Sequence, residues 1–257
     1  MSPNTTRYTP LKGRTALVTG STGGLGVAIA KALAGQGALV VVSGRNKERG
    51  NAVVAEIRSA GGHAEFVAAD LGAGGNEVRR LAQQAAEAAG GQIDILINNA
   101  GVWGMPEPTG EVSEPALLQS YQTNVIAPFL LTGALAPAMA ERGHGAVVNV
   151  GSITGLVGGD KSALYSSTKA AVHSLTKSWA VEYGPRGVRV NAVAPGPIAT
   201  ERAADVADEI APVLARIPSR RMSTPEEVAA AVVFLAGEGA GNIHGTILSV
   251  DGGWAAA

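Results

Sequence analysis

A tyrosine and a lysine four residues apart give this sequence its clearest candidate for chemistry. Tyr165 and Lys169 lie in a stretch with a helical pattern, so both side chains emerge on one helical face. A phenol has an unperturbed pKa near ~10, and a neighbouring ammonium favours the phenolate and lowers that pKa toward neutrality. The spacing therefore predicts a general acid/base. Such pairs also occur by chance, and the weight of this one comes from Ser152, which ends a predicted strand and carries a hydroxyl suited to holding a carbonyl.

A glycine-rich turn, Thr19–Gly26, falls where the first predicted strand meets the first predicted helix. Glycine lets the backbone bend sharply and approach a pyrophosphate, and a helix N-terminus supplies free N–H groups and a positive dipole end. Gly20, Gly24 and Gly26 suit those purposes. No Gly-Lys-Ser/Thr sequence follows, which excludes a Walker A loop. The alternative is a set of packing glycines, but the position directly after the first strand favours a dinucleotide site.

The end of the second predicted strand bears on which dinucleotide is bound. An acidic residue there would bind the adenosine ribose hydroxyls of NAD. This sequence has Ser43-Gly44-Arg45-Asn46 and no carboxylate. The guanidinium of Arg45 can form a charge-assisted fork to a 2′-phosphate. We therefore favour NADP(H), with NAD(H) possible and a solvated arginine as the alternative interpretation.

Short apolar runs alternate with longer helical patterns from residue 14 almost to the end. Strands that are apolar on both faces and joined by crossover helices form a parallel sheet covered on both sides. The sequence thus predicts an α/β protein with a three-layer, doubly wound Rossmann fold and a seven-stranded parallel sheet. The predicted strands are Thr15–Thr19, Ala38–Ser43, Ala64–Asp70, Ile93–Ala100, Gly145–Ser152, Val188–Gly196 and Thr246–Val250. The predicted helices are Leu25–Leu33, Glu48–Ser59, Val78–Ala88, Pro115–Met139, Ser162–Tyr183 and Pro225–Leu235.

The chain shows no linker and no internal repeat. We predict a flexible tail over residues 1–11, which lacks the apolar core of a secretory signal, and a single domain over residues 12–257. Residues 199–223 interrupt the β-α rhythm with mixed charges and two prolines, after the carboxyl end of a strand. This segment fits a lid over the ligand, and a surface loop is the alternative.

Composition excludes several classes of protein. The chain has no cysteine, which removes disulfide scaffolds, thiolate nucleophiles and cysteine-bound metals. Net charge is -1, so no broad cationic field is expected for nucleic acid or anionic lipid, and no long apolar run suggests a membrane span. The four histidines are dispersed, which predicts no metal site. We expect a cytoplasmic protein acting on a small molecule, without nucleic-acid or membrane partners.

Further motifs occur in a characteristic order. Asn98-Asn99-Ala100-Gly101 follows the fourth predicted strand, Asn124 and Ser152 come next, and Tyr165-Ser166-Ser167-Thr168-Lys169 follows them. Pro195–Thr200 and Asp251–Gly253 complete the series. With these motifs the chain resembles the short-chain dehydrogenase/reductase family, in particular its 3-oxoacyl-ACP reductase-like members, over essentially everything past the tail.

That resemblance implies an oxidoreductase that interconverts a ketone or aldehyde and an alcohol, assembled as a homotetramer or homodimer. It implies that Tyr165 donates the proton, Ser152 polarises the carbonyl, Lys169 holds the nicotinamide ribose and lowers the tyrosine pKa, and Asn124 anchors a water. Some NADP-using members place a basic residue inside the glycine turn, where this chain has Gly23, so the NADP prediction depends on Arg45. The full set of predicted cofactor-binding residues is Gly20, Thr22, Gly24, Leu25, Gly26, Arg45, Asp70, Leu71, Asn98, Ala100, Gly101, Tyr165, Lys169, Pro195, Gly196, Ile198 and Thr200.

The substrate cannot be derived from these motifs. Trp103, Met105, Leu156 and Val157 follow predicted strand ends and suggest a substrate with hydrocarbon bulk. Two other functions stay open: an NAD-dependent alcohol dehydrogenase, and a dinucleotide-binding sensor without catalysis. Against the sensor, a binding module has no need of a phenol–ammonium pair.

Overall fold

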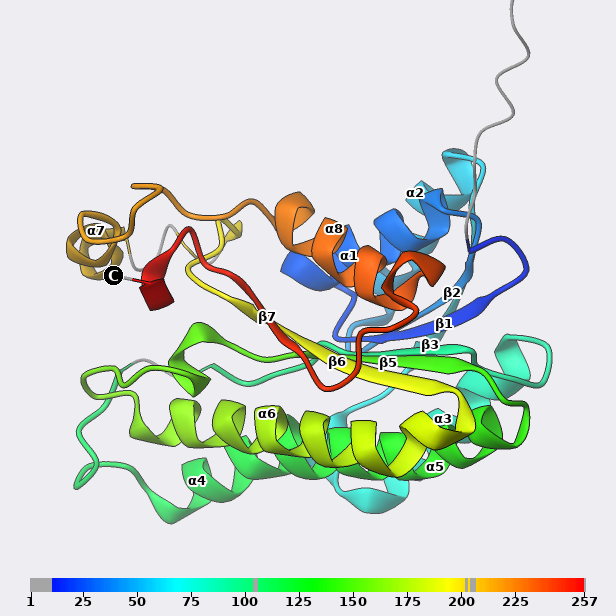
Figure 1. Cartoon of the computed structure of the whole chain (residues 1–257), viewed down its shortest axis with the longest axis horizontal. Helices are drawn as coiled ribbons and strands as arrows, with labels where there is room; N and C mark the ends of the chain where they lie inside the picture. The colour runs from blue at the N-terminus through cyan, green and yellow to red at the C-terminus, as the bar shows by residue number, and fades with distance from the viewer. Residues whose placement is uncertain (1–10, 104–105, 202, 204–206, 257) are drawn as a thin grey trace, which may run out of the picture.

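A computed structural model describes residues 11–103, 106–201, 203 and 207–256 of the chain (Figure 1). Within that part the strands form one seven-stranded sheet in the order β3-β2-β1-β4-β5-β6-β7, and every neighbouring pair is parallel. The order reverses between β1 and β4, and ligands of doubly wound sheets bind at that point. The strands are β1 Thr15–Thr19, β2 Leu39–Gly44, β3 His63–Ala68, β4 Ile95–Asn98, β5 Gly145–Val150, β6 Val188–Pro195 and β7 Ile247–Val250.

Helices cover both faces of the sheet (Figure 1). One face carries α1 (Gly24–Gly35), α2 (Lys47–Ser59) and α8 (Pro225–Ala236), with α1 packed closely on α8. The other face carries α3 (Gly75–Ala88), α5 (Ala127–Glu141) and α6 (Ala163–Tyr183). The three-layer, doubly wound prediction is therefore confirmed.

Each face of the sheet has its own hydrophobic core. On one side Ile29 and Leu33 of α1 pack with Val232 of α8, all fully buried. On the other side Leu81 of α3 and Leu131 of α5 are equally inaccessible to water. Strands such as β1, buried along their whole length, need apolar residues on both faces, and this explains the continuous apolar runs in the sequence.

The predicted helix over residues 115–139 is divided in the structure. It begins as α4 (Glu114–Tyr121), widens into a π-helical segment η2 (Gln122–Ile126) and continues as α5. By length and hydropathy (1.4) the whole stretch Glu114–Glu141 has the features of a membrane-crossing helix. Since 56% of its apolar window is buried inside the protein, the same features fit a helix packed on the sheet.

The structure differs from two predictions, the end of the N-terminal tail and the content of the lid segment. Leu11, predicted to belong to the tail, is 2% exposed, and its backbone N–H donates to the carbonyl of Gln36, 3.0 Å away. Residues 1–10 of the predicted tail lie outside the described residues. The predicted lid contains a helix that the sequence did not indicate, α7 (Ala207–Leu214), at one end of the molecule (Figure 1). An isolated β-bridge between Ile198 and Ser223 joins the two ends of the predicted lid segment.

Candidate active site

Two glycines of the glycine-rich turn, Gly20 and Gly26, leave no room for a side chain. A Cβ on Gly20, whose φ is +65°, would lie 2.8 Å from the Cα of Ala100, and one on Gly26 would lie 2.3 Å from the carbonyl oxygen of Gly20. Helix α1 begins just after Gly23, a capping residue that has no side chain to accept from the first N–H groups of the helix. Those N–H groups stay available for an anion, so the turn fits a pyrophosphate.

A cavity of about 570 Å³ opens over this turn, within the usual range of ~300–1,000 Å³ for small-molecule sites. Its walls come from the β1–α1 turn and from the segments after β2, β3 and β4. These are the carboxyl ends of neighbouring parallel strands, where a dinucleotide is held in this fold. The predicted cofactor residues that line it are Gly20, Thr22, Gly24, Leu25, Gly26, Arg45, Asp70, Leu71, Ala100, Gly101 and Thr200.

Two arginines lie at the β2 end of the cavity. Arg45 follows the strand, and Arg49 lines the same wall from the first turn of α2. The Asn46 side chain caps that helix by accepting from the Arg49 backbone N–H at 2.8 Å. In the described part of the chain neither guanidinium forms an ion pair with a carboxylate. Sequence reasoning missed Arg49, and helical spacing could not point to it, because Arg45 lies before the cap of α2.

Asp70 and Leu71 line the cavity where the chain leaves β3. The Asp70 carboxylate caps a short 3-10 turn, η1 (Leu71–Ala73), by accepting from the N–H of Gly72 at 3.0 Å. This bond fixes the backbone that forms the wall. Leu71 is buried, and Gln122 donates to its carbonyl oxygen at 3.2 Å.

The structure does not place the Asn98 side chain in the cavity. Its amide donates to Asn149 Oδ1 at 2.8 Å and to Thr132 Oγ1 at 3.4 Å, on the face covered by α5 and α6. The next residue, Asn99, lines the cavity, and its side chain donates to the carbonyl of Thr19 at 2.8 Å. Successive residues of an extended chain point to opposite sides, which explains why two adjacent asparagines have different surroundings.

Asn124 lies in the π-helical segment η2 and is almost fully buried. Its side chain accepts from the N–H of Val102 at 2.7 Å, and donates to the Val102 carbonyl at 2.9 Å and to Thr168 Oγ1 at 3.1 Å. These bonds tie the loop after β4 to helix α6 at the residue before Lys169. Single π turns are rare and often occur at functional sites.

Ser152 follows β5 and caps the 3-10 turn η3 (Ile153–Gly155). Its hydroxyl accepts from the N–H of Thr154 at 3.2 Å and shares a hydrogen bond with Thr154 Oγ1 at 3.0 Å. The same hydroxyl lies close enough to the Tyr165 side chain to lower the pKa of its phenol. The two hydroxyls therefore converge on one point beyond the end of β5.

Tyr165 and Lys169 lie one turn apart on α6, as their spacing predicts. The Lys169 ammonium is 5.5 Å from the centre of the Tyr165 ring and donates to the carbonyl of Val150 at 2.8 Å. A Cβ on Gly101, a cavity residue, would lie 3.5 Å from Lys169 Nζ. The acid/base pair thus adjoins the glycine-lined cavity.

The pKa values correct one expectation. Burial raises the pKa of Tyr165 to about 12, and the nearby Ser152 hydroxyl opposes this increase. Burial also lowers the pKa of Lys169, to about 8. The expected decrease of the tyrosine pKa by the ammonium does not appear, because loss of hydration outweighs any attraction between the two groups.

Besides Asn98, Tyr165 and Lys169, three more predicted cofactor residues lie outside the cavity wall. Pro195 is buried at the end of β6, and the N–H of Gly196 donates to the carbonyl of Val250 at 3.1 Å. Ile198 pairs with Ser223 at the base of the predicted lid. All three lie at the end of β6 or just after it, at the same edge of the sheet as Thr200, which does line the cavity.

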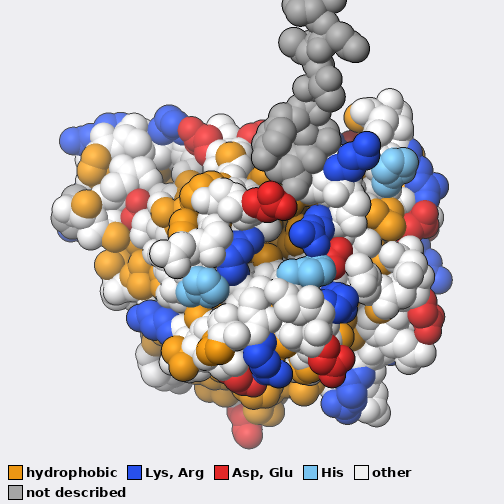
Figure 2. All heavy atoms as spheres, turned by 45° about the vertical axis from the view of Figure 1, so that its right-hand side comes forward, with side chains coloured by type: hydrophobic (Ala, Val, Ile, Leu, Met, Phe, Trp, Pro, Cys, Tyr) orange, Lys and Arg blue, Asp and Glu red, His pale blue; other side chains and the backbone are white. Residues whose placement is uncertain are grey.

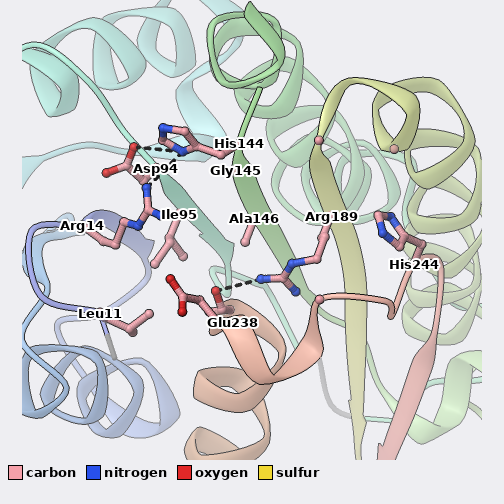
Figure 3. Close-up of a pocket in the computed structure, with 14 residues that line it drawn as sticks. Leu11, Arg14, Asp94, Ile95, His144, Gly145, Ala146, Arg189, Glu238 and His244 are labelled. Carbon is pink, nitrogen blue, oxygen red and sulfur yellow. Dashed lines mark hydrogen bonds and ion pairs between the residues drawn. The ribbon is translucent and has the colours of Figure 1, made fainter. Parts of the chain in front are cut away.

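A second cavity, of about 400 Å³, lies at the opposite sheet edge (Figure 3). Buried Asp94 there accepts from the N–H of Thr15 at 3.0 Å, and Arg14 bonds to His144 Nδ1 at 3.1 Å. On the other side Arg189 donates to carbonyls at the end of α8, including that of Ala236 at 2.9 Å. These bonds join the amino ends of strands to their neighbours, which is a structural role. On the molecular face that Figure 2 shows, basic and acidic side chains are interspersed rather than gathered.

Comparisons with known proteins agree with this geometry. A family model for short chain dehydrogenases matches residues 14–211. The chain is 41% identical to cis-4-hydroxycyclohexanecarboxylate dehydrogenase of Sinomonas cyclohexanicum, covering 95% of this chain and 97% of that protein. It is 38% identical to cyclopentanol dehydrogenase of Comamonas sp., with coverage of 93% and 96%.

A solved structure also closely matches this fold. A proposed NAD(P)-dependent gluconate 5-dehydrogenase from Beutenbergia cavernae, with NADP bound at low occupancy, superposes with a TM-score of 0.91. It is 39% identical, and the match covers 97% of this chain and all of that one (100%). The chain therefore belongs to the short chain dehydrogenase family, as its motifs predicted. It is an oxidoreductase that interconverts alcohols and carbonyls with a nicotinamide cofactor.

Proposed function

We propose that this chain is an NADP(H)-dependent carbonyl reductase or alcohol dehydrogenase in which Tyr165 is the acid/base. One observation carries the proposal: the hydroxyls of Ser152 and Tyr165 converge beside the Lys169 ammonium, next to a glycine-lined cavity. A sensor that only binds the dinucleotide has no use for these groups.

Each side chain has a separate task in carbonyl reduction. The glycine turn and Arg45 would hold NADPH, which when bound would supply the hydride for reduction of the carbonyl carbon. The Tyr165 hydroxyl donates its proton to the carbonyl oxygen, and the Ser152 hydroxyl donates a hydrogen bond to the same oxygen. Lys169 provides a positive charge beside the phenolate that forms. Asn124 holds the loop after β4 through its bonds to Val102, and we retain the proposal that it anchors a water.

The arginines at the end of β2 predict a preference for NADPH. A charge-assisted hydrogen bond contributes ~1.5–3 kcal/mol, so Arg45→Asp should lower kcat/KM for NADPH relative to NADH roughly 10- to 100-fold. Steady-state kinetics with both cofactors measures this ratio. Arg58→Asp, which makes the same charge change at the other end of α2, is the control and should leave the ratio unchanged. An unaltered ratio in Arg45→Asp would show that Arg45 does not bind the 2′-phosphate, and a wild-type preference for NADH would favour the NAD-dependent alternative.

The two directions of the reaction should respond oppositely to pH. Because the pKa of Tyr165 is raised to about 12, the phenol is protonated at neutral pH and ready to donate a proton in carbonyl reduction. Alcohol oxidation needs the phenolate instead, so its rate should rise steadily as pH increases. Initial rates in both directions across the pH range test this. An oxidation rate independent of pH would contradict Tyr165 as the titrating base.

An alicyclic or otherwise apolar secondary alcohol, with its ketone, is the substrate class that we propose. Trp103 follows β4 and Leu156 follows η3, and these apolar side chains are 42% and 46% exposed near the strand ends that carry the site. Met105, predicted to join them, lies outside the described residues. The names of the cyclic-alcohol relatives support the proposal, whereas the gluconate enzyme argues for a polar substrate.

A substrate panel tests both the activity and this class. Cyclopentanone, cyclohexanone, acyclic ketones and a 3-oxoacyl thioester are reduced with NADPH while its absorbance is followed, and gluconate is tested with NADP. Turnover of the cyclic ketones is the expected result. Preference for gluconate would refute the apolar class, and no turnover of any carbonyl or alcohol would favour the sensor.

The assembly and location that we propose are a homotetramer or homodimer in the cytoplasm, each chain working as one domain. Large apolar side chains are exposed on helices of one face of the sheet: Leu118 on α4 is 58% exposed, Phe129 on α5 51% and Val181 on α6 78%. Exposed apolar surface of this kind is typical of an interface. Light scattering of the purified protein determines the oligomeric state. We propose no nucleic-acid or membrane partner.

A further inference from the structure

A buried histidine lies directly beneath the turn that carries Ser152. His173 is on α6, one helical turn after Lys169, and is 4% exposed. Neither of its ring nitrogens has a hydrogen-bond partner within the described residues, and the backbone of Gly155 lies close by. A buried imidazole without a good partner costs free energy that an apolar side chain would not, so packing alone does not explain the residue.

The ring of His173 contacts both glycines that flank Ser152. A Cβ on Gly151 would lie only 2.1 Å from His173 Nε2, and a Cβ on Gly155 would lie 2.8 Å from His173 Cε1. Gly155 also lies against the backbone of α6, since its Cβ would be 2.8 Å from the carbonyl carbon of Lys169. The Ser152 turn therefore rests on α6 with its first glycine against the His173 ring.

This contact connects the histidine with the reacting groups. Ser152 lies between the two glycines, and its hydroxyl lowers the pKa of the nearby Tyr165 phenol, so any shift of the turn changes the distance between those hydroxyls. We propose that His173 is a positioning residue for the reaction: its ring, fitted against Gly151, sets where the Ser152 hydroxyl stands relative to the Tyr165 hydroxyl. The inference rests on the proposed roles of Ser152 and Tyr165.

The charge state of the ring suits this position. Burial lowers the pKa of His173 to about 4, so the ring is neutral when the enzyme works. The charged groups that face it are Lys169 and Lys177, both from its own helix. From the segment that carries Ser152, Gly151 and Gly155 lie against the ring, and neither carries a charge. A neutral ring fills the space without adding a third positive charge.

The fit between His173 and Gly151 can be tested by a pair of exchanges. Gly151→Ala forces a methyl group against the ring, and His173→Ala removes the support of the turn. Each should lower kcat at least roughly 10-fold, because a displacement of ~1 Å at a reacting group can cost 10²-fold. KM for NADPH should stay within about twofold, since the glycine turn is untouched. Gly151 has no positive φ, so alanine is not excluded there by backbone strain.

The double variant decides the issue. In the variant that carries both Gly151→Ala and His173→Ala, the new methyl group can occupy the space that the ring leaves. The kcat of this double variant should therefore be higher than that of Gly151→Ala alone. It should also be higher than the value obtained by multiplying the two single effects. Rescue is expected to be partial, because the same Cβ would still lie 3.1 Å from the carbonyl of Val193. Thermal melting and NADPH fluorescence titration show which variants are folded and bind the cofactor. His173→Gln, a neutral polar side chain, replaces His173→Ala if that variant does not fold.

A pH profile separates positioning from plain loss of structure. The Ser152 hydroxyl lowers the pKa of Tyr165, so moving it away in His173→Ala should shift the rise of alcohol oxidation to higher pH. A structural defect alone would leave the midpoint of that rise, set by the Tyr165 pKa of about 12, unchanged. Lys177→Ala, one turn further along the same helix and exposed, should change neither kcat nor the profile.

The outcomes distinguish this inference from the proposed function. If Tyr165→Phe abolishes turnover but both single variants keep the wild-type kcat and pH profile, the role of His173 is refuted and the acid/base role stands. Independent effects of the two exchanges, with no rescue in the double variant, also refute it. If Tyr165→Phe keeps full activity, the proposed function itself is wrong.

Discussion

Replacing Tyr165 with phenylalanine is expected to lower kcat for carbonyl reduction by roughly 10²–10⁴-fold, the usual contribution of a positioned general acid/base. The substitution removes only the hydroxyl group, so the half-buried ring keeps its place on α6 beside Lys169. The Ser152 hydroxyl remains and can still bind a carbonyl oxygen, but it lacks a proton donor of suitable acidity. KM for NADPH should change little, since the cavity over the glycine turn is lined by other residues.

The same exchange at a remote site is the matched control. Tyr183 is buried near the other end of α6, so Tyr183→Phe removes a hydroxyl from the same helix without touching the site. It should keep nearly full kcat. Steady-state rates with the best ketone of the panel, together with NADPH fluorescence titration, measure both variants. Full turnover by Tyr165→Phe would mean that another group supplies the proton.

Features governed by local pattern were accessible from the sequence. Strand β1 is apolar along its length because both its faces are buried, and that pattern is visible in five residues. The glycine turn could be located because steric contacts at Gly20 and Gly26 leave no room for a Cβ. The partnership of Tyr165 and Lys169 follows from the repeat of the helix alone.

Features that depend on packing between distant segments could not be predicted from the sequence. Which of the two adjacent asparagines, Asn98 or Asn99, faces the cavity is decided by bonds to Thr132, Asn149 and Thr19 on other elements. The π-helical segment around Asn124 has an ordinary helical composition, and its bonds to Val102 arise only in the fold.

The electrostatics of the acid/base pair show the same limit. Sequence spacing brings an ammonium close to a phenol, which by itself would lower the phenol pKa. The spacing does not tell how deeply the two groups are buried, and burial dominates both pKa values in the structure. The protein therefore maintains a phenol that is protonated at neutral pH beside a lysine whose burial as a charged group lowers the stability of the fold.

That cost leads to a second large effect: Lys169→Met should abolish most activity and yet stabilise the fold. Burial lowers the pKa of Lys169 from 10.5 to about 8, and each pKa unit corresponds to ~1.4 kcal/mol, so the folded state loses roughly 3 kcal/mol by keeping the ammonium charged at pH 7. Methionine fills similar space without charge, but it gives up the hydrogen bond to Val150. We expect a net gain of ~1–3 kcal/mol in the free energy of unfolding at pH 7.

The pH dependence of this gain identifies its cause. Below pH 8 wild-type Lys169 is protonated in both the folded and unfolded states, so the full cost is present. Between pH 8 and 10.5 the unfolded chain holds a proton that the folded protein has released, so wild-type stability rises with pH through the contribution of this group. The difference between Lys169→Met and the wild type should therefore shrink as the pH rises through that window. Urea denaturation at pH 7 and near pH 10.5 measures it, with the exposed Lys177→Met as the control that should show neither gain nor loss of activity. A variant less stable than the wild type at pH 7 would show that the ammonium and its bond to Val150 hold the fold together, instead of being kept for the reaction against a cost in stability.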